Sequence, residues 1–309
     1  MKIEPLVSII IPFYNRFDLL ENTLLSVSKQ DYNNYEVLLV DDCSESQLDI
    51  NRVERLFDNY RVIYKCLEKN SGPGLARSKG RELASGKYVA YLDSDDLWEP
   101  RFLRSTVDIM EDDPEISMSF TNVLIKHKNK KTKRLKIQEG VYDFYDLIFK
   151  KKIYWATGAA LWRSDVSLSS NWKPTRDHED YVHDILSLQF NPKIYHVSET
   201  LCVVNKNAVL GIKRSNVEML NSLNILLGSD MLFQTFNQYE LSKDFVNFVL
   251  RRISRRNYRM QDVRLVLKTY RNLLRWSENY IGFSLNYIKC VLQKPYWIKR
   301  IQKLPQKLT

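Results

Sequence analysis

The chain has 309 residues, 44% hydrophobic and 27% charged, with a formal net charge of +10, a composition typical of a soluble globular protein that buries a sizeable core. No apolar run approaches the ~20 residues of a membrane-spanning helix, and the short, acidic start of the chain does not match a signal peptide. Four scattered cysteines predict reduced thiols, so we expect a cytoplasmic protein and exclude a disulfide scaffold.

The first half of the chain alternates between short apolar runs and helical patterns. Four predicted strands are near-continuously apolar, as strands buried on both faces are: residues 7–11, 36–40, 61–66 and 88–92. Helical patterns lie between and after them, at the stripe Leu20, Leu24 and Val27, the stripe Leu48, Val53 and Leu56, residues 75–84 and residues 100–110. This alternation predicts an α/β fold with a Rossmann-like, mostly parallel sheet flanked by helices.

The second half has a looser pattern. Residues 116–125 predict a strand, and residues 126–136, with seven Lys or Arg, predict the tip of a hairpin. No aromatic residues interleave with these charges, which argues against nucleic-acid contact. Residues 141–150 predict a helix, residues 156–160 a bend of small residues, and the segment from about residue 217 to the end is helical in pattern.

The positive charge is concentrated at the C-terminal end. Residues 251–309 carry 15 Lys and Arg against two acidic residues, whereas the first 250 residues have a net charge of −3. Two apolar stripes repeat there at helical spacing, one through Val263, Leu267, Tyr270 and Leu274 and one through residues 281–292. These stripes predict either packing on the catalytic domain or attachment to an anionic membrane surface, which the aromatic and basic residues 295–301 favour.

Three carboxylates, Asp93, Asp95 and Asp96, follow the strand predicted at 88–92 within four positions. Like charges so close repel one another unless a cation lies between them, and hard divalent cations prefer oxygen ligands. The pattern therefore indicates a Mn²⁺ or Mg²⁺ site that holds a diphosphate. The alternative is a solvated turn that precedes the next helix.

The ends of the predicted strands carry a common set of groups. Residues 12–15 contain an aromatic ring, Asp41 and Asp42 follow the second strand, and residues 70–77 form a Gly-rich turn with Arg77. In a parallel sheet these groups lie along one edge, and together they suit a nucleotide diphosphate. The motifs of dinucleotide-binding and P-loop proteins do not occur.

A second acidic group, Asp177 to Asp180, precedes a predicted helix. For Asp177 the favoured interpretation is a helix cap, whereas Glu179 and Asp180 are candidates for the base that a transferase needs. A zinc hydrolase motif would need a histidine at Val182, so that class is excluded.

Five segments in register resemble glycosyltransferase family 2: residues 7–15, 40–42, 70–77, 86–96 and 179–180. The resemblance covers about residues 5–205. It implies a glycosyltransferase A-type fold and inverting, metal-dependent transfer of a sugar, of hexosyl or N-acetylhexosaminyl type, from a nucleotide-diphosphate donor to an acceptor hydroxyl, in bacterial surface-polysaccharide or lipopolysaccharide synthesis. The acceptor is expected to be a saccharide or a lipid-linked saccharide.

The resemblance also assigns the site residues. It places Tyr14 against the base with Pro12 shaping its loop, Asp42 and Asp41 in the base pocket, and Arg77 at the nucleotide or diphosphate. Asp180 is the expected general base, with Glu179 supporting it or contacting the acceptor, and Thr157-Gly158 falls in the acceptor-side loop. Asp95 and Asp93 are the expected metal ligands; Asn15 and Ser94 complete the donor site. Where the family closes over the diphosphate this chain has residues 201–207, and Lys206 is the candidate for the positive charge there.

We therefore expect a catalytic domain at residues 1–215, divided into a nucleotide-sugar half (1–112) and an acceptor half (113–215), and a basic helical region at 216–309. The expected location is cytoplasmic and peripheral on the inner face of the cell membrane, with no nucleic-acid partner. A sugar-phosphate nucleotidyltransferase and a basic nucleic-acid-binding protein are the alternatives. The identity of the sugar, base and acceptor and the oligomeric state stay open, and an oligomer is compatible with the sequence.

Overall fold

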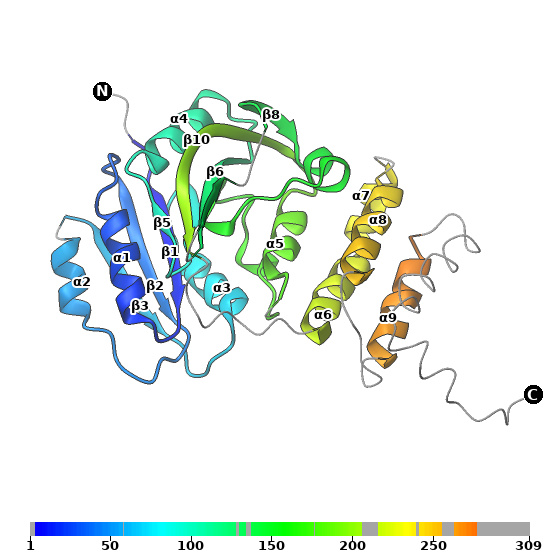
Figure 1. Cartoon of the computed structure of the whole chain (residues 1–309), viewed down its shortest axis with the longest axis horizontal. Helices are drawn as coiled ribbons and strands as arrows, with labels where there is room; N and C mark the ends of the chain where they lie inside the picture. Colours follow the sequence, from blue (N-terminus) through cyan, green and yellow to red (C-terminus); the bar gives the residue numbers. More distant parts are fainter. Residues whose placement is uncertain are drawn as a thin grey trace, which may run out of the picture. The chain divides into compact units, whose positions relative to one another are not determined.

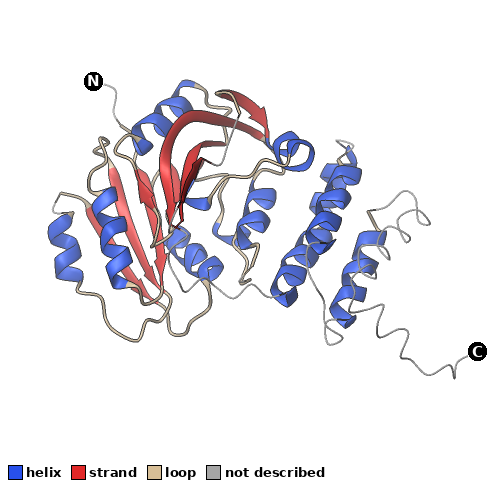
Figure 2. Ribbon diagram, viewed as in Figure 1, coloured by secondary structure: helices blue, strands red, loops and turns tan. Residues whose placement is uncertain are grey.

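The computed structural model describes residues 4–57, 59–127, 130–133, 137–175, 177–205, 216–238, 241–254 and 263–276. The chain forms two compact units, Met1–Lys213 and Arg214–Thr309. The first unit is built around one large sheet with helices packed against it, and the second is helical in its described residues (Figures 1 and 2).

The first unit begins with the predicted alternation of strands and helices. The strands are β1 (Val7–Phe13), β2 (Tyr35–Asp41), β3 (Arg61–Cys66) and β4 (Tyr88–Tyr91), which lie in the order β3-β2-β1-β4 and pair in parallel. The helices are α1 (Phe17–Val27), α2 (Ile50–Leu56), α3 (Pro73–Leu83) and α4 (Phe102–Asp112). All four predicted strands and all four predicted helices of this half are therefore confirmed, with small shifts at their ends.

Both faces of the central strands are covered, as their apolar runs require. Ile9 and Ile11 belong to one buried cluster with Leu20 and Leu24 of α1. Ile10 points to the opposite face, because alternate residues of a strand do, and there it meets α3. A Cβ at Gly80 of α3 would lie 2.4 Å from the Ile10 Cγ2 atom, so the absence of a side chain allows α3 to lie this close to the sheet.

The sheet continues through strands that run in both directions. Its full order is β3-β2-β1-β4-β9-β6-β10-β5, with β7 paired to β6 and β8 to β10. The added strands are β5 (Leu97–Trp98), β6 (Met118–His127), β7 (Lys130–Lys133), β8 (Gly140–Asp143), β9 (Ala160–Arg163) and β10 (Lys193–Asn205). The strand predicted at 116–125 is β6, and its antiparallel pairing with β7 confirms the hairpin.

The helix predicted at residues 141–150 is wrong in its first three residues, which form a strand, and confirmed from residue 144 on, where the backbone is helical. Val141 and Tyr142 lie in β8, which pairs antiparallel with β10, and a π-helical turn, η1 (Asp146–Lys151), follows. Val141 is 51% exposed and Tyr142 partly buried, so this edge strand alternates as a strand does. Val141 and Tyr142 form a strand because they pair with the edge of β10. β-branched and aromatic residues favour a strand where such an edge is available for pairing.

The second unit contains α6 (Asn216–Leu227), α7 (Asp230–Gln238), α8 (Ser242–Ser254) and α9 (Val263–Leu274). The face of α9 that packs is not the predicted stripe. Leu267 of that stripe is 51% exposed, whereas Val266 and Leu273 are buried, and Thr269 bonds to Asn224 of α6 over 2.9 Å. The spacing of apolar residues identified the helix, but the buried face lies one residue earlier than the predicted stripe.

The second stripe, at residues 281–292, and the segment 295–301 lie outside the described residues. Among the residues that the structure does describe, no helix has both the length and the apolar character required to cross a membrane.

Candidate active site

The parallel strands bring the predicted donor residues to one edge of the sheet. We call the residues 12–16, 41–44, 70–77 and 93–96, which lie in or after the ends of β1, β2, β3 and β4, the carboxyl edge. The strand order places β1 between β2 and β4, so the segments after these three strands are neighbours (Figure 1). Ligands of open α/β sheets bind at this edge.

The segment after β1 has an unusual backbone. Asn15 and Arg16 both have positive φ, at 53° and 60°, a conformation that non-glycine residues rarely adopt. The turn is fixed to the segment after β2, because the Asn15 N–H donates to Ser44 Oγ (2.7 Å) and its Oδ1 accepts from the Glu45 N–H (3.0 Å). Tyr14 is left 41% exposed beside it, where its ring is available for stacking.

The two carboxylates at the end of β2 organise neighbouring loops. Asp41 accepts hydrogen bonds from the Ser44 N–H (2.8 Å) and from the Tyr64 hydroxyl (2.9 Å). Asp42 accepts from the N–H groups of Ser71 (2.7 Å) and Gly72 (2.8 Å). Both side chains are buried at this edge, and Asp42 holds the Gly-rich turn in place.

The Gly-rich turn at residues 70–74 leads into α3, and neighbouring segments pack closely against it. Gly72 has φ +89°, which favours glycine, and Pro73 then opens the helix. A Cβ at Gly74 would lie 2.3 Å from the carbonyl oxygen of Lys173. The turn therefore needs glycine at 72 for its backbone and at 74 for contact with the segment before α5 (Glu179–Ser187).

Arg77 of α3 joins the carboxyl edge to α5. Its side chain is only 4% exposed and pairs with Asp93 Oδ1 through Nη2 (2.6 Å) and with Glu179 Oε1 through Nη1 (3.2 Å). The guanidinium also lies over the ring of Trp172, 4.9 Å from its centre. Its Nε has no hydrogen-bond partner among the described residues. In this structure Arg77 thus bridges two predicted site carboxylates.

Three carboxylates meet after β4. Oxygen atoms of Asp93, Asp95 and Asp96 lie within 4.8 Å of one another. Asp96 is 4% exposed and accepts from the Asn205 N–H (3.0 Å), whereas the side chains of Asp93 and Asp95 are 38% and 19% exposed. The oxygen donors and spacing fit a hard divalent cation, and Asp93 and Asp95 are the more accessible of the three carboxylates.

The second predicted acidic group is divided by the start of α5. His178 is the N-cap residue, in the left-handed conformation and without a capping side-chain hydrogen bond, so the predicted cap at Asp177 is wrong. Asp177 instead pairs with the His178 ring over 2.8 Å. Glu179 and Asp180 form the first turn of the helix, where the helix dipole favours negative charge.

Glu179 is buried between charged groups. Desolvation, with the neighbouring Asp180 carboxylate adding to it, raises the pKa of Glu179 to about 7, although Arg77 acts in the opposite direction. A carboxyl group with a pKa near neutrality exchanges its proton readily at physiological pH. Such perturbed groups cluster at functional sites.

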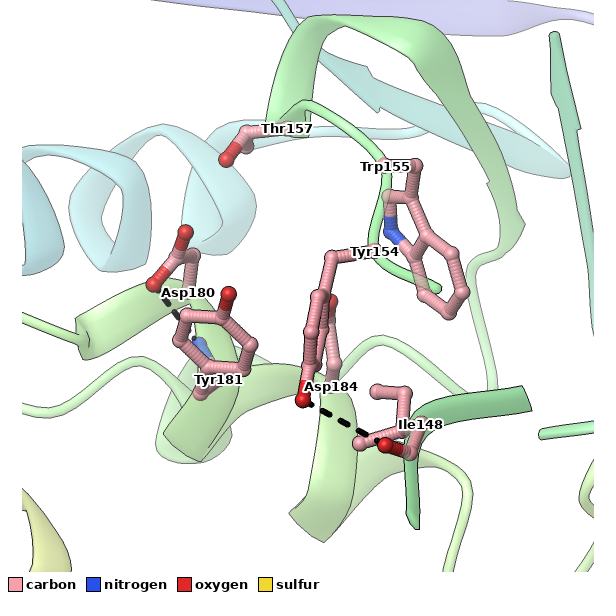
Figure 3. Close-up of a pocket in the computed structure, with 7 residues that line it drawn as sticks. All are labelled: Ile148, Tyr154, Trp155, Thr157, Asp180, Tyr181 and Asp184. Atoms are coloured by element: carbon pink, nitrogen blue, oxygen red, sulfur yellow. Dashed lines mark hydrogen bonds between the residues drawn. The ribbon is translucent and has the colours of Figure 1, made fainter. Parts of the chain in front are cut away.

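Asp180 borders a small pocket between α5 and the segment 154–157 (Figure 3). Asp180 accepts from the Tyr181 N–H (2.8 Å), and the rings of Tyr154 and Tyr181 meet edge to face with centres 5.3 Å apart. The pocket is lined by Ile148, Tyr154, Trp155, Thr157, Asp180, Tyr181 and Asp184. Aromatic rings next to carboxylates are suited to sugar hydroxyl groups and ring faces.

The predicted acceptor-side residues Thr157 and Gly158 lie in the turn η2 (Thr157–Ala159). Thr157 lines the pocket beside Asp180, and a Cβ at Gly158 would be 3.8 Å from Asp96 Oδ2. The turn therefore lies between the carboxylate cluster and the pocket. Lys206, the candidate for closing over the diphosphate, lies outside the described residues.

Several residues of this region were not predicted. Arg16 pairs with Asp95 (3.0 Å), and Trp172 stacks on the buried His183 with ring centres 4.0 Å apart. Asp184 is buried, which raises its pKa well above the usual range. Arg16 follows Asn15 directly and could have been included with it, but no local pattern identified Trp172 or Asp184.

Comparison with known proteins identifies the family. The model of glycosyl transferase family 2 matches residues 8–167, more than half of the chain. TuaG of Bacillus subtilis, assigned as a glycosyltransferase of teichuronic acid biosynthesis, is 43% identical over 109 residues, 35% of this chain and 42% of TuaG. WfgD of Escherichia coli, a UDP-Glc:alpha-D-GlcNAc-diphosphoundecaprenol beta-1,3-glucosyltransferase, is 35% identical over 124 residues, 40% of this chain and 48% of WfgD. The chain thus matches less than half the length of each relative.

Solved structures show the same fold at low identity. TarS of S. aureus, residues 1–349 in complex with UDP-GlcNAc, superposes with a TM-score of 0.76 over 97% of this chain and 93% of that chain, at 15% identity. The mannosyltransferase PcManGT of Pyrobaculum calidifontis, in complex with GDP-Man and Mn²⁺, gives 0.54 over 96% and 89%, at 16% identity. The first unit has the predicted glycosyltransferase A-type fold, and the chain belongs to glycosyl transferase family 2.

Proposed function

We propose that this protein is an inverting, metal-dependent glycosyltransferase that moves a sugar from a nucleotide-diphosphate donor to an acceptor hydroxyl. The observation that carries the proposal is the bridge made by Arg77. It joins Asp93 of the carboxylate cluster to Glu179, the neighbour of the candidate base Asp180. A donor site and a base are thereby held in one charged network, as transfer between two substrates requires.

The donor half of the site uses the carboxyl edge. Tyr14 is exposed for stacking on the base. Pro12 precedes it in β1, and Asn15 fixes its turn. Asp41 and Asp42 shape the pocket through their contacts with the neighbouring loops. Asp42 accepts hydrogen bonds from the N–H groups of Ser71 and Gly72. The main contribution of Asp42 is therefore to hold the Gly-rich turn and so to shape the pocket.

Asp95 and Asp93 would hold Mn²⁺ or Mg²⁺, with Ser94 between them. Bound there, the cation supplies positive charge for the departing nucleotide diphosphate. Arg77 holds Asp93 in position through an ion pair of 2.6 Å. The Mn²⁺ in the mannosyltransferase complex supports this choice of metal.

Asp180 is proposed as the general base that takes the proton of the acceptor hydroxyl, which then attacks the anomeric carbon from the face opposite the leaving group. The pocket that Asp180 borders is the proposed acceptor entrance (Figure 3). Glu179 supports it by keeping Arg77 in place. Because the pKa of Glu179 is near 7, this side chain is partly protonated at neutral pH, which lessens its repulsion of the neighbouring Asp180.

The donor carries a hexosyl or N-acetylhexosaminyl group, and the acceptor is a saccharide or lipid-linked saccharide in cell-surface polysaccharide synthesis. TuaG and WfgD support this assignment, because one belongs to teichuronic acid synthesis and the other acts on a diphosphoundecaprenol-linked sugar. The family match favours this activity over a nucleotidyltransferase or a nucleic-acid-binding protein.

We further propose that residues 216–309 attach the catalytic domain, residues 1–215, to the cytoplasmic face of the membrane. The exposed side of α9 carries Leu267 together with Arg264, Lys268 and Arg271. An exposed apolar residue among cations matches an anionic lipid surface. A lipid-linked acceptor gives this attachment a purpose.

The activity is tested by release of the nucleoside diphosphate from a panel of nucleotide sugars, with Mn²⁺ or with EDTA, for the wild type and Asp95→Asn. We expect metal-dependent turnover of one donor class in the wild type and its loss in Asp95→Asn. Asp165→Asn, in an exposed position, is the matched control. A donor turned over equally in EDTA contradicts the metal assignment, and no turnover of any nucleotide sugar contradicts the activity.

Membrane attachment is tested by sedimentation with anionic and neutral vesicles. Each basic residue near an anionic surface contributes about 1 kcal/mol, so the triple change of Arg264, Lys268 and Arg271 to Glu should weaken binding by about 100-fold or more. The same change at the exposed residues Lys29, Arg55 and Lys65 is the control. Equal binding to neutral and anionic vesicles would contradict the proposed mechanism.

A further inference from the structure

A chain of hydrogen bonds runs through the protein interior from β4 to the pocket beside Asp180. The hydroxyl groups of Tyr91 and Ser167 are 2.7 Å apart, and Ser167 Oγ lies 2.8 Å from His183 Nε2. The other ring nitrogen of His183, Nδ1, lies 3.0 Å from Asp184 Oδ1. Tyr91, Ser167 and His183 are fully buried. The Asp184 side chain, in contrast, is 15% exposed and lines the pocket (Figure 3), so the chain ends at a carboxyl group that a ligand can reach.

Ser167, His183 and Asp184 are bonded in the order of a hydrolase triad, but their burial excludes that chemistry. A nucleophilic serine has to reach its substrate, whereas Ser167 is 0% exposed and its hydroxyl is also bonded to Tyr91. The His183 ring stacks on Trp172 with ring centres 4.0 Å apart, and burial lowers the pKa of His183 well below its usual range. This neutral and closely packed imidazole is therefore suited to hold Asp184 in one orientation.

Asp184 keeps hydrogen-bonding capacity for a ligand. A carboxylate offers about four acceptor positions. In the part of the chain that the structure describes, two hydrogen-bond partners act on this group, the His183 ring and the Trp155 side chain. Burial, and secondly the neighbouring Asp180, raises the pKa of Asp184 well above its usual range, and acidic groups perturbed in this way cluster at functional sites. The remaining positions are thus available to a polar group that enters the pocket.

Asp180 and Asp184 lie four positions apart on α5 and line the same pocket, and Cβ atoms at this helical spacing are about 5–6 Å apart. Resting on the proposed function, we propose that Asp184 binds a non-reacting hydroxyl group of the acceptor sugar while Asp180 takes the proton of the reacting one. The pocket is small, so it admits a hydroxyl or hydroxymethyl group and not a whole sugar ring. A sugar carries several hydroxyl groups a few ångströms apart. Two carboxylates on one helix face can therefore hold two of them and fix which one reacts.

The test compares Asp184→Asn with the wild type in transfer to water and in transfer to sugars. Hydrolysis of the nucleotide sugar, in which water is the acceptor, needs the donor site and Asp180 but no second hydroxyl contact. We therefore expect Asp184→Asn to hydrolyse the donor at the wild-type rate. The sugar probes are octyl α- and β-glycosides of glucose, galactose and their N-acetylhexosamine counterparts. For the glycoside that the wild type uses, kcat/KM should fall by about tenfold, because a hydrogen bond to a carboxylate is stronger than one to an amide.

Deoxy analogues of that glycoside test the contact without any change to the protein. Among the analogues that still react, the one lacking the hydroxyl bound by Asp184 should be used about tenfold less well by the wild type. The Asp184→Asn change should then have little further effect on this analogue, because the interaction is already absent. Circular dichroism checks the fold of the variant, whose uncharged amide has the size of the carboxyl group. Asp165→Asn, at an exposed position, is the matched control and should change none of these rates.

The outcomes separate this inference from the proposed function. A wild type that neither hydrolyses nor transfers any nucleotide sugar contradicts the proposed function itself. If the wild type is active and a folded Asp184→Asn loses donor hydrolysis in parallel with transfer, Asp184 acts in the chemical step or on the donor, and the inference is overturned. Equal use of every reactive deoxy analogue and the parent glycoside by the wild type overturns it as well. The same holds if no glycoside is an acceptor or an inhibitor of donor hydrolysis, since the pocket then binds no sugar group.

Discussion

Substitution of Glu179 by Gln should change how the stability of the protein depends on pH. Burial raises the pKa of Glu179 from its ordinary value of 4.5 to about 7. The folded protein therefore keeps this proton to a higher pH than the unfolded chain does. Since the folded state then binds more protons between pH 4.5 and 7, the free energy of unfolding falls as pH rises through that window.

The magnitude follows from the two pKa values. At ~1.36 kcal/mol for each pH unit, the full effect is about 3.4 kcal/mol, and about 2.5 kcal/mol of it falls between pH 5 and pH 8. Gln has the size of Glu and still accepts the hydrogen bond from Arg77 Nη1, but it does not titrate. Relative to the wild type, Glu179→Gln should therefore gain about 2.5 kcal/mol of stability between pH 5 and pH 8.

The assay is urea unfolding followed by tryptophan fluorescence at pH 5 and pH 8. Comparing variant with wild type removes the contributions of other titrating groups, such as the buried Asp184. Glu82→Gln, in the exposed pair with Lys79 on α3, is the matched control and should show no such gain. A difference between Glu179→Gln and wild type that stays constant with pH would refute the reasoning, because Glu179 would then be ionised beside Arg77 at pH 5 already.

Three further changes test other parts of the site. Asp95→Asn should lower transfer by about 100-fold and remove the effect of Mn²⁺ on nucleotide affinity, measured by calorimetry, because an amide lacks the charge that a hard cation requires. Asp180→Asn should reduce transfer by ~10²–10⁴-fold with nearly unchanged donor affinity, since the base acts on the acceptor; a comparable loss of donor affinity would contradict that role. Gly74→Ala should lower stability by about 1–3 kcal/mol in thermal unfolding, because the added Cβ would lie 2.3 Å from the Lys173 carbonyl oxygen.

The first half of the fold was predictable because its signals are local. β1 and β2 are buried over all their residues, so they are apolar except at Ser8, Glu36 and the terminal Asp41. The second half depends on pairing between distant segments. β9 lies antiparallel between β4 and β6, and β8 pairs with β10 some 50 residues later, which no window of sequence reveals.

The candidate site divides in the same way. The carboxylates were found from their position after a strand, which is a local rule, and the structure brings Asp93, Asp95 and Asp96 together as that rule predicts. The partners of these carboxylates were not found. The sequence suggested Arg77 as a ligand of the nucleotide, but its location between Asp93 and Glu179 depends on how α3 and α5 pack, 102 residues apart in the chain.

The position of Arg77 between Asp93 and Glu179 would couple the two proposed substrates. Arg77 contacts one carboxylate of the proposed donor half and one of the proposed acceptor half, and its guanidinium is buried against Trp172. A buried arginine that loses one carboxylate is left with uncompensated charge, which is costly. In the proposed mechanism, a shift of Asp93 on metal binding would therefore change the interaction of Arg77 with Glu179, and through Glu179 the electrostatic field at Asp180. We therefore expect donor binding to influence the proposed base, Asp180, through the single side chain of Arg77.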